Sequence, residues 1–94
     1  MKQLIVNADD FGLVKSVNEG IAKAYKEGIV TFINLLPSGP SFESSLGLLK
    51  DLNLKEIGAH LSLTATRPVT KSGRVPSLVD KDGEFRAGYI QFFL

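Results

Sequence analysis

The sequence predicts an α/β protein with parallel strands, because three apolar runs alternate with two amphipathic segments. The runs occupy residues 3–7, 29–33 and 56–63, and a segment of helical periodicity lies in each interval between them. A helical connection of this length carries the chain back across the sheet, so it joins strands that run in the same direction. The predicted architecture is therefore a βαβαβ unit of a parallel α/β sheet or barrel.

The first predicted strand, residues 3–7, contains the apolar triplet Leu-Ile-Val and is followed by a helix. Ser16 and Glu19 have the spacing of a capping box, so we expect this helix to begin at Ser16. Gly28 is predicted to end it in a left-handed conformation. The apolar residues that recur at helical spacing between these points are Val17, Ile21, Ala24 and Tyr25.

The second predicted strand, residues 29–33, is rich in β-branched and aromatic residues. A loop with Pro37, Gly39 and Pro40 follows, and Ser41 is suited to cap the next helix. The third predicted strand covers residues 56–63. The apolar stripe of the second helix consists of Phe42, Leu46, Leu49 and Leu52.

Beyond residue 63 the alternation of strands and helices stops. Residues 64–77 have the composition of a loop, and residues 78–80 and 84–86 resemble short hairpin arms around an Asp-Gly turn. Residues 89–94 are strongly apolar. We therefore expect residues 1–94 to be a single amino-terminal fragment of a larger domain. The phenylalanines expected in the core are Phe32, Phe42, Phe92 and Phe93.

Composition restricts the classes of partner. A chain of 94 residues can bury one modest core. Its 11 Lys and Arg against 10 Asp and Glu create no strong field, so neither nucleic acid nor a membrane is an expected partner. The sequence has no cysteine, which excludes disulfides and thiolate metal ligands. It also lacks a signal-like or membrane-spanning apolar run, so the cytoplasm is the expected location.

Ionisable side chains are predicted to meet at one edge of the sheet. Asp9 and Asp10 follow the first predicted strand, and His60 lies near the end of the third. The carboxyl ends of parallel strands share an edge, and adjacent carboxylates there repel unless a cation lies beside them. An aspartate together with an imidazole suits zinc or another divalent metal, and leaves the other aspartate to deprotonate a metal-bound water. This combination predicts hydrolysis.

Other interpretations of the same residues remain open. The acidic pair can simply solvate a strand end, and Asn7 and Asn34 can serve either a substrate or ordinary turns. A receiver-like signalling module also has an acidic pair after its first strand, which binds magnesium. That class requires an aspartate after the third strand, where this sequence has His60. A catalytically inactive fragment is the third alternative.

Several blocks of the sequence, in order along nearly the whole chain, resemble the YdjC-like carbohydrate deacetylases, which include chitooligosaccharide deacetylase. Asn-Ala-Asp-Asp-Phe-Gly and His-Leu-Ser-Leu-Thr are the most specific of these blocks. The blocks lie at residues 4–12, 16–21, 28–31, 39–43, 57–64 and 75–85.

This resemblance implies a (β/α) barrel-like fold and removal of acetyl groups from N-acetylated amino sugars. It also implies a divalent metal ion, Mg or Zn, held by one aspartate and two histidines. Matched residue by residue, Asp10 and His60 become metal ligands and Asp9 the general base. The sequence has one histidine, and the family's second metal-binding histidine lies beyond residue 94. We therefore expect an incomplete site, and self-association or homo-oligomerisation through uncovered apolar edges.

Overall fold

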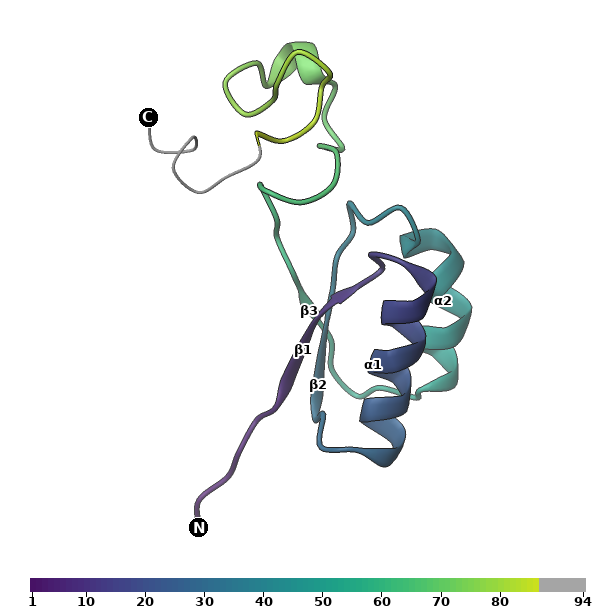
Figure 1. Ribbon diagram of the computed structural model, residues 1–94. Helices are drawn as coiled ribbons and strands as arrows, with labels where there is room; N and C mark the ends of the chain where they lie inside the picture. The colour runs from purple at the N-terminus through teal and green to yellow at the C-terminus, as the bar shows by residue number, and fades with distance from the viewer. Residues whose placement is uncertain (87–94) are drawn as a thin grey trace. The chain divides into compact units, whose positions relative to one another are not determined.

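The computed structural model describes residues 1–86, and the chain divides into two compact units after Leu61. The first unit contains three strands and two helices (Figure 1). In chain order these are β1 (Asn7–Phe11), α1 (Lys15–Glu27), β2 (Phe32–Leu35), α2 (Phe42–Asp51) and β3 (Gly58–Ala59). The second unit begins at Ser62, and its described residues, 62–86, include one short 3-10 helix, η1 (Ser72–Arg74).

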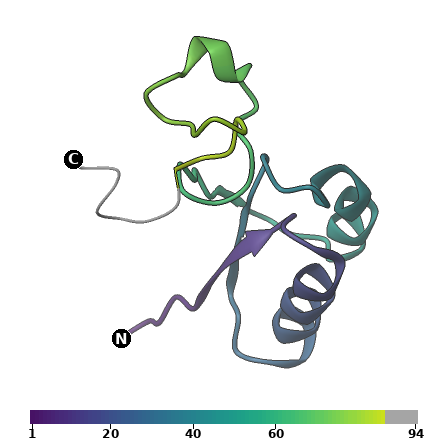
Figure 2. The ribbon, with the colours of Figure 1, turned by 45° about the horizontal axis from the view of Figure 1, so that its top comes forward.

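The three strands form one parallel sheet in the order β1-β2-β3, which confirms the predicted βαβαβ arrangement. Both helices cover the same face of this sheet (Figures 1 and 2). Sequential strands with helices on one side are the repeating unit of a (β/α) barrel. A receiver-type sheet instead places its first strand between the second and third. The observed strand order therefore argues against the receiver-like alternative.

The strands begin later than the apolar runs predicted. β1 covers Asn7–Phe11 instead of residues 3–7, so Asp9 and Asp10 lie within the strand and not after it. Leu4 and Ile5 are 81% and 75% exposed. β2 likewise starts at Phe32, and β3 is limited to two residues. Pairing with a neighbouring strand, and not local hydrophobicity, sets these bounds.

The two helices form where the sequence predicts them, but the first begins differently. The first hydrogen bond of α1 runs from the Asn18 N–H to the Val14 carbonyl, so Val14 is the N-cap and makes no side-chain capping bond. Ser16 lies inside the first turn, and the predicted capping box is wrong. Gly28 does end the helix, with φ −114° and therefore outside the left-handed region. Ser41 precedes α2 as predicted, although its hydroxyl makes no capping bond.

The core of the first unit lies between the sheet and its two helices. Phe11 and Ile33 are completely buried there. Removing such a side chain from water contributes about 1.5–3 kcal/mol. Phe32 and Phe42, which were expected in the core, are only partly buried, and Phe92 and Phe93 lie outside the described residues. Within residues 1–86, neither helix has the length and apolar character needed to cross a membrane.

The second unit contains the hairpin that the sequence predicts. Val79 and Phe85 form an antiparallel bridge, and both are buried. Gly83 in the connecting turn has a φ of 78°, a conformation that glycine adopts without strain. The side chain of Asp80 closes the turn, because its Oδ1 accepts the backbone N–H groups of residues 82 and 84 at 2.9 and 3.1 Å.

Residues 64–77 form a loop, as predicted, apart from the single turn η1. Arg67 in this loop forms an ion pair with Glu84 of the hairpin. The apolar segment at residues 89–94 lies outside the described residues.

The loops that follow β1 and β2 meet backbone to backbone at Gly12 and Gly39. A β-carbon at position 39 would overlap the Gly12 carbonyl oxygen and lie 3.0 Å from the Leu13 nitrogen. One at position 12, where φ is 116°, would lie 2.8 Å from the Leu36 carbonyl oxygen. The Ser41 N–H also donates to the Gly12 carbonyl at 2.9 Å. These contacts join the two loops at the carboxyl end of the sheet.

We expect Gly39→Ala to destabilise the protein by about 1–3 kcal/mol, because the added carbon meets backbone atoms that cannot rotate away. Gly47→Ala is the matched control, since a β-carbon at that position in α2 meets nothing within 4 Å. The control should be neutral or stabilising by up to about 1 kcal/mol. Urea unfolding followed by circular dichroism measures both changes, and equal effects would contradict the loop contact.

Candidate metal centre at the carboxyl end of the sheet

One extra residue in β1, at Asp10, interrupts the regular alternation of side chains between the two faces of the sheet. Three steps along β1 match two steps along β2 at this point, which is the signature of a bulge. Asp10 occupies the irregular position, with a φ of 69°. In a regular strand neighbouring side chains point to opposite faces, so one acid would face the helices. The paired residues on either side of the bulge are Ala8 with Ile33 and Phe11 with Leu35.

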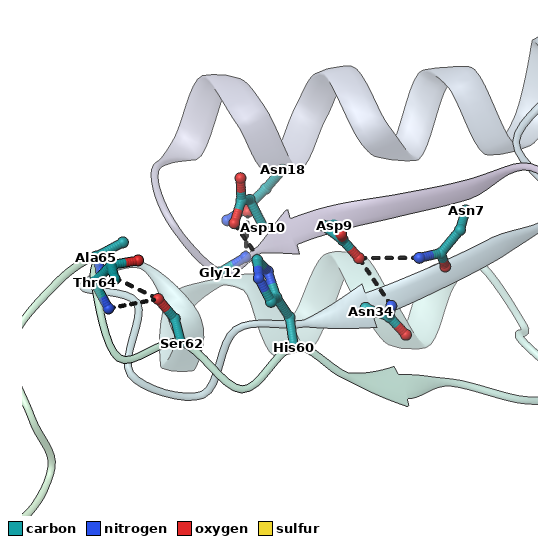
Figure 3. Close-up of polar contacts among 10 residues, drawn as sticks. All are labelled: Asn7, Asp9, Asp10, Gly12, Asn18, Asn34, His60, Ser62, Thr64 and Ala65. Carbon is teal, nitrogen blue, oxygen red and sulfur yellow. Dashed lines mark hydrogen bonds and ion pairs between the residues drawn. The ribbon is translucent and has the colours of Figure 1, made fainter. Parts of the chain in front are cut away.

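Asp9 lies between two asparagine amides on the face of the sheet opposite the helices, which we call the open face (Figure 3). Its Oδ1 accepts a hydrogen bond from Asn7 Nδ2 at 3.0 Å and another from Asn34 Nδ2 at 2.8 Å. The two asparagines near the predicted strand ends therefore serve the carboxylate of Asp9 in this structure.

Asp10 contacts His60, the residue that follows β3 (Figure 3). The distance between Asp10 Oδ1 and His60 Nδ1 is 3.0 Å. The His60 N–H donates to the Leu35 carbonyl at 2.6 Å, which extends the parallel ladder and fixes the backbone that carries the ring. The sequence therefore correctly predicts that Asp10 and His60 meet, although they are 50 positions apart.

One of the two ring nitrogens of His60, Nδ1, is buried without a hydrogen-bond partner among residues 1–86. Nδ1 is fully buried, although the side chain as a whole is 31% exposed. Its approach to Asp10 lacks the alignment of a hydrogen bond, and within residues 1–86 it has no other hydrogen-bond partner. A buried polar atom without a partner carries a cost in free energy, which a ligand at that atom would remove.

The Asp10–His60 pair fits two ligand positions of a divalent metal ion. Ligands at about 2.0–2.2 Å from a divalent ion lie about 3 Å apart in the octahedral geometry of magnesium and about 3.3–3.6 Å apart in the tetrahedral geometry of zinc. The observed separation of 3.0 Å matches the octahedral value and is a few tenths of an ångström shorter than the tetrahedral one. Among the described residues no group of three or more His, Cys, Asp or Glu side chains comes together. Asp10 and His60 are therefore two candidate ligands in this part of the chain.

Asn18 supports the site and was not assigned a role from the sequence. It is 3% exposed, and its Oδ1 accepts the Gly12 N–H at 2.6 Å. The Leu13 N–H donates to the Asp10 carbonyl at 3.0 Å, so the turn directly after Asp10 is held at two points. A signal was present: Asn18 is a polar residue on the buried face of α1, one helical turn before Ala22.

The family model for YdjC-like proteins matches residues 3–94, and the chain belongs to this family. The match confirms the resemblance found in the sequence motifs and removes the receiver-like alternative. It covers the whole of the α/β unit and the Asp10–His60 pair.

Curated relatives within the family have been named for their reaction. The chain is 48% identical over 86 residues to a carbohydrate deacetylase of Brevibacillus brevis, covering 92% of this chain and 34% of the relative. It is 43% identical over 83 residues to one of Clostridium beijerinckii, covering 88% and 33%. The chain thus spans about a third of the length of the curated relatives it matches.

A solved structure from Enterococcus faecalis V583, provisionally described as a cellobiose-phosphate cleavage protein, has a closely similar fold. The TM-score is 0.85 at 39% sequence identity, over 95% of this chain and 35% of that one. The α/β fold class predicted from the sequence is therefore shared with a solved protein that is about three times as long as this chain.

We expect Asn18→Ala to lower the free energy of unfolding by about 1–3 kcal/mol, because it leaves the Gly12 N–H without its buried acceptor. Lys23→Ala is the control, since Lys23 is an exposed residue of the same helix and its loss should change stability by less than about 0.5 kcal/mol. Urea titrations of both variants check the difference. Identical midpoints would mean that the turn after Asp10 does not depend on Asn18.

Proposed function

We propose that residues 1–94 supply two metal ligands and the general base of a metal-dependent carbohydrate deacetylase site. The observation that carries the proposal is the fully buried, unbonded Nδ1 of His60 at 3.0 Å from Asp10 Oδ1. Asp9 is the acid not engaged with His60. The curated relatives named carbohydrate deacetylase support acetylated sugars as the substrate class. Within that class we propose N-acetylated amino sugars, including chitooligosaccharides.

The proposed roles follow from the partners of each side chain. Asp10 Oδ1 and His60 Nδ1 hold a divalent cation, Mg or Zn. When bound, such a cation polarises the acetyl carbonyl and makes a coordinated water more acidic. Asp9 removes a proton from the attacking water as that water bonds to the carbonyl carbon. The same carboxyl group then returns the proton to the amine as the C–N bond breaks, releasing acetate and the amino sugar.

The two ligands are fewer than the three that a catalytic metal site usually draws from its protein. His60 is the one histidine of the sequence, and the family resemblance implies a second histidine outside residues 1–94. We therefore propose that these residues correspond to the amino-terminal third of a deacetylase domain, a length supported by the relatives' coverage. Self-association through exposed apolar residues such as Leu4 and Ile5 stays a prediction.

A second candidate reaction is the cleavage of a phosphorylated disaccharide. It is favoured by the description of the Enterococcus faecalis relative as a cellobiose-phosphate cleavage protein. The products separate the two reactions, because a deacetylase releases acetate while a disaccharide-cleaving enzyme releases a reducing sugar. Incubation with an N-acetylated chitooligosaccharide and, separately, with cellobiose phosphate decides between them.

We expect the protein to bind Zn²⁺ or Mg²⁺, and Asp10→Ala or His60→Ala to weaken that binding by at least about tenfold. Loss of a partner that merely orients a ligand costs 10–100-fold in other metal sites, so loss of a ligand should cost no less. Isothermal titration calorimetry measures the affinity. Asp51→Ala, which removes an exposed acid from the end of α2, should leave it unchanged. Equal affinity in all variants would refute the ligand assignment.

We expect Asp9→Asn to lower the rate of acetate release by about 10²–10⁴-fold, because an amide cannot accept the proton of the attacking water. Metal affinity should stay within about twofold of the unchanged protein. A coupled acetate assay alongside calorimetry separates these effects. If Asp9→Asn abolished metal binding as well, Asp9 would be a ligand and the two aspartates would have to exchange roles.

A further inference from the structure

We propose that Asn34 is a positioning residue that, together with Asn7, orients Asp9 so that its Oδ2 is the oxygen that takes the proton. The inference rests on the proposed function, since it assumes that Asp9 is the general base. It goes beyond that function in assigning roles to residues that contact neither the proposed metal nor the reacting atoms.

The hydrogen bonds distinguish the two oxygens of Asp9. Asn34 Nδ2 at 2.8 Å and Asn7 Nδ2 at 3.0 Å both donate to Oδ1. A carboxylate oxygen has two lone-pair sites, so these amides occupy both sites of Oδ1. Within residues 1–86, Oδ2 receives no hydrogen bond, and Asp9 is exposed. The free oxygen is therefore the one available to an incoming water.

Gly58 provides an independent observation that the Asn34 amide is held in place. Gly58 pairs with Asn34 across the sheet. A β-carbon at Gly58 would overlap Asn34 Oδ1 and lie 2.9 Å from both Asn34 Cγ and the ring carbon Cε1 of Phe32. Gly58 has no positive φ, so the backbone there is open to any residue. The requirement for glycine is therefore one of space, and the closest atom in that space belongs to Asn34, the side chain that donates to Asp9, with the Phe32 ring beside it.

A fixed orientation of this kind matters for proton transfer. The rate depends on holding the base within a few tenths of an ångström of its productive position, and a misplacement of about 1 Å can cost about 10²-fold. Asp9 is exposed and would otherwise sample several rotamers. Contacts that run from Gly58 on β3 through Asn34 on β2 to Asp9 on β1 hold it from its Oδ1 side.

The first test observes the hydrogen bond without requiring activity. In ¹⁵N-labelled protein, the side-chain amide resonances of Asn34 should shift when Asp9→Ala removes the acceptor. They should also shift in Gly58→Ala, where the new methyl group displaces the amide. Gly20→Ala is the control, because a β-carbon at Gly20 in α1 meets nothing within 4 Å. The inference would be overturned if the Asn34 side-chain resonances shifted in neither Asp9→Ala nor Gly58→Ala.

The second test uses kinetics with an N-acetylated chitooligosaccharide. We expect Asn34→Ala and Gly58→Ala each to lower kcat by about 10–100-fold, with KM and metal affinity changed less than about twofold. The double variant should be no slower than Asn34→Ala alone, because position 58 acts through Asn34. It should also regain part of the stability lost in Gly58→Ala, since the amide that the methyl group strikes is gone while the contact with the Phe32 ring remains.

The outcomes separate this inference from the proposed function. Absence of both metal binding and acetate release in the unchanged protein would refute the proposed function, and the general-base inference with it. Normal activity in the unchanged protein together with an unchanged kcat in Asn34→Ala would refute the positioning role alone. Additive losses in the double variant would likewise overturn it, since they would show that Gly58 acts by a separate route.

Discussion

The extra residue at Asp10 is the constraint on which the arrangement of the open face depends. A regular β1 would send Asp9 and Asp10 to opposite faces, and one carboxylate would be buried against the helices. The left-handed backbone of Asp10 absorbs the additional residue and returns Phe11 to the core, where it is completely buried. An irregularity of this kind costs on the order of 1–3 kcal/mol, and the buried Phe11 offsets a cost of that size.

Two adjacent acids thereby acquire different surroundings. Asp9 is held by neutral amides from β1 and β2, whereas Asp10 lies against the imidazole that follows β3. Each acid therefore depends on a different neighbour along the sheet. This division allows one carboxylate to coordinate a cation while the other remains free for proton transfer. The parallel direction of the strands is what brings all three carboxyl ends to the same edge.

The sequence was sufficient to predict the parallel α/β class, the position of both helices and the approach of Asp10 to His60. It was insufficient for the strand bounds, because Leu4 and Ile5 have the character of a strand and yet lie exposed before β1. The bulge was not predictable from the sequence either, because an aspartate does not indicate a positive φ as a glycine does. The position of Asn18 on the buried face of α1 is a signal that it has a buried partner, but no spacing of residue types reveals that the partner is the backbone N–H of Gly12.

The contact between Gly12 and Gly39 has a consequence for how members of this family can diverge. Because neither position tolerates a β-carbon without moving the other loop, the two segments must change together. Grafting one of them alone from a distant homologue would introduce a backbone collision at the rim of the sheet. Engineering at this edge of the sheet therefore has to exchange both loops together.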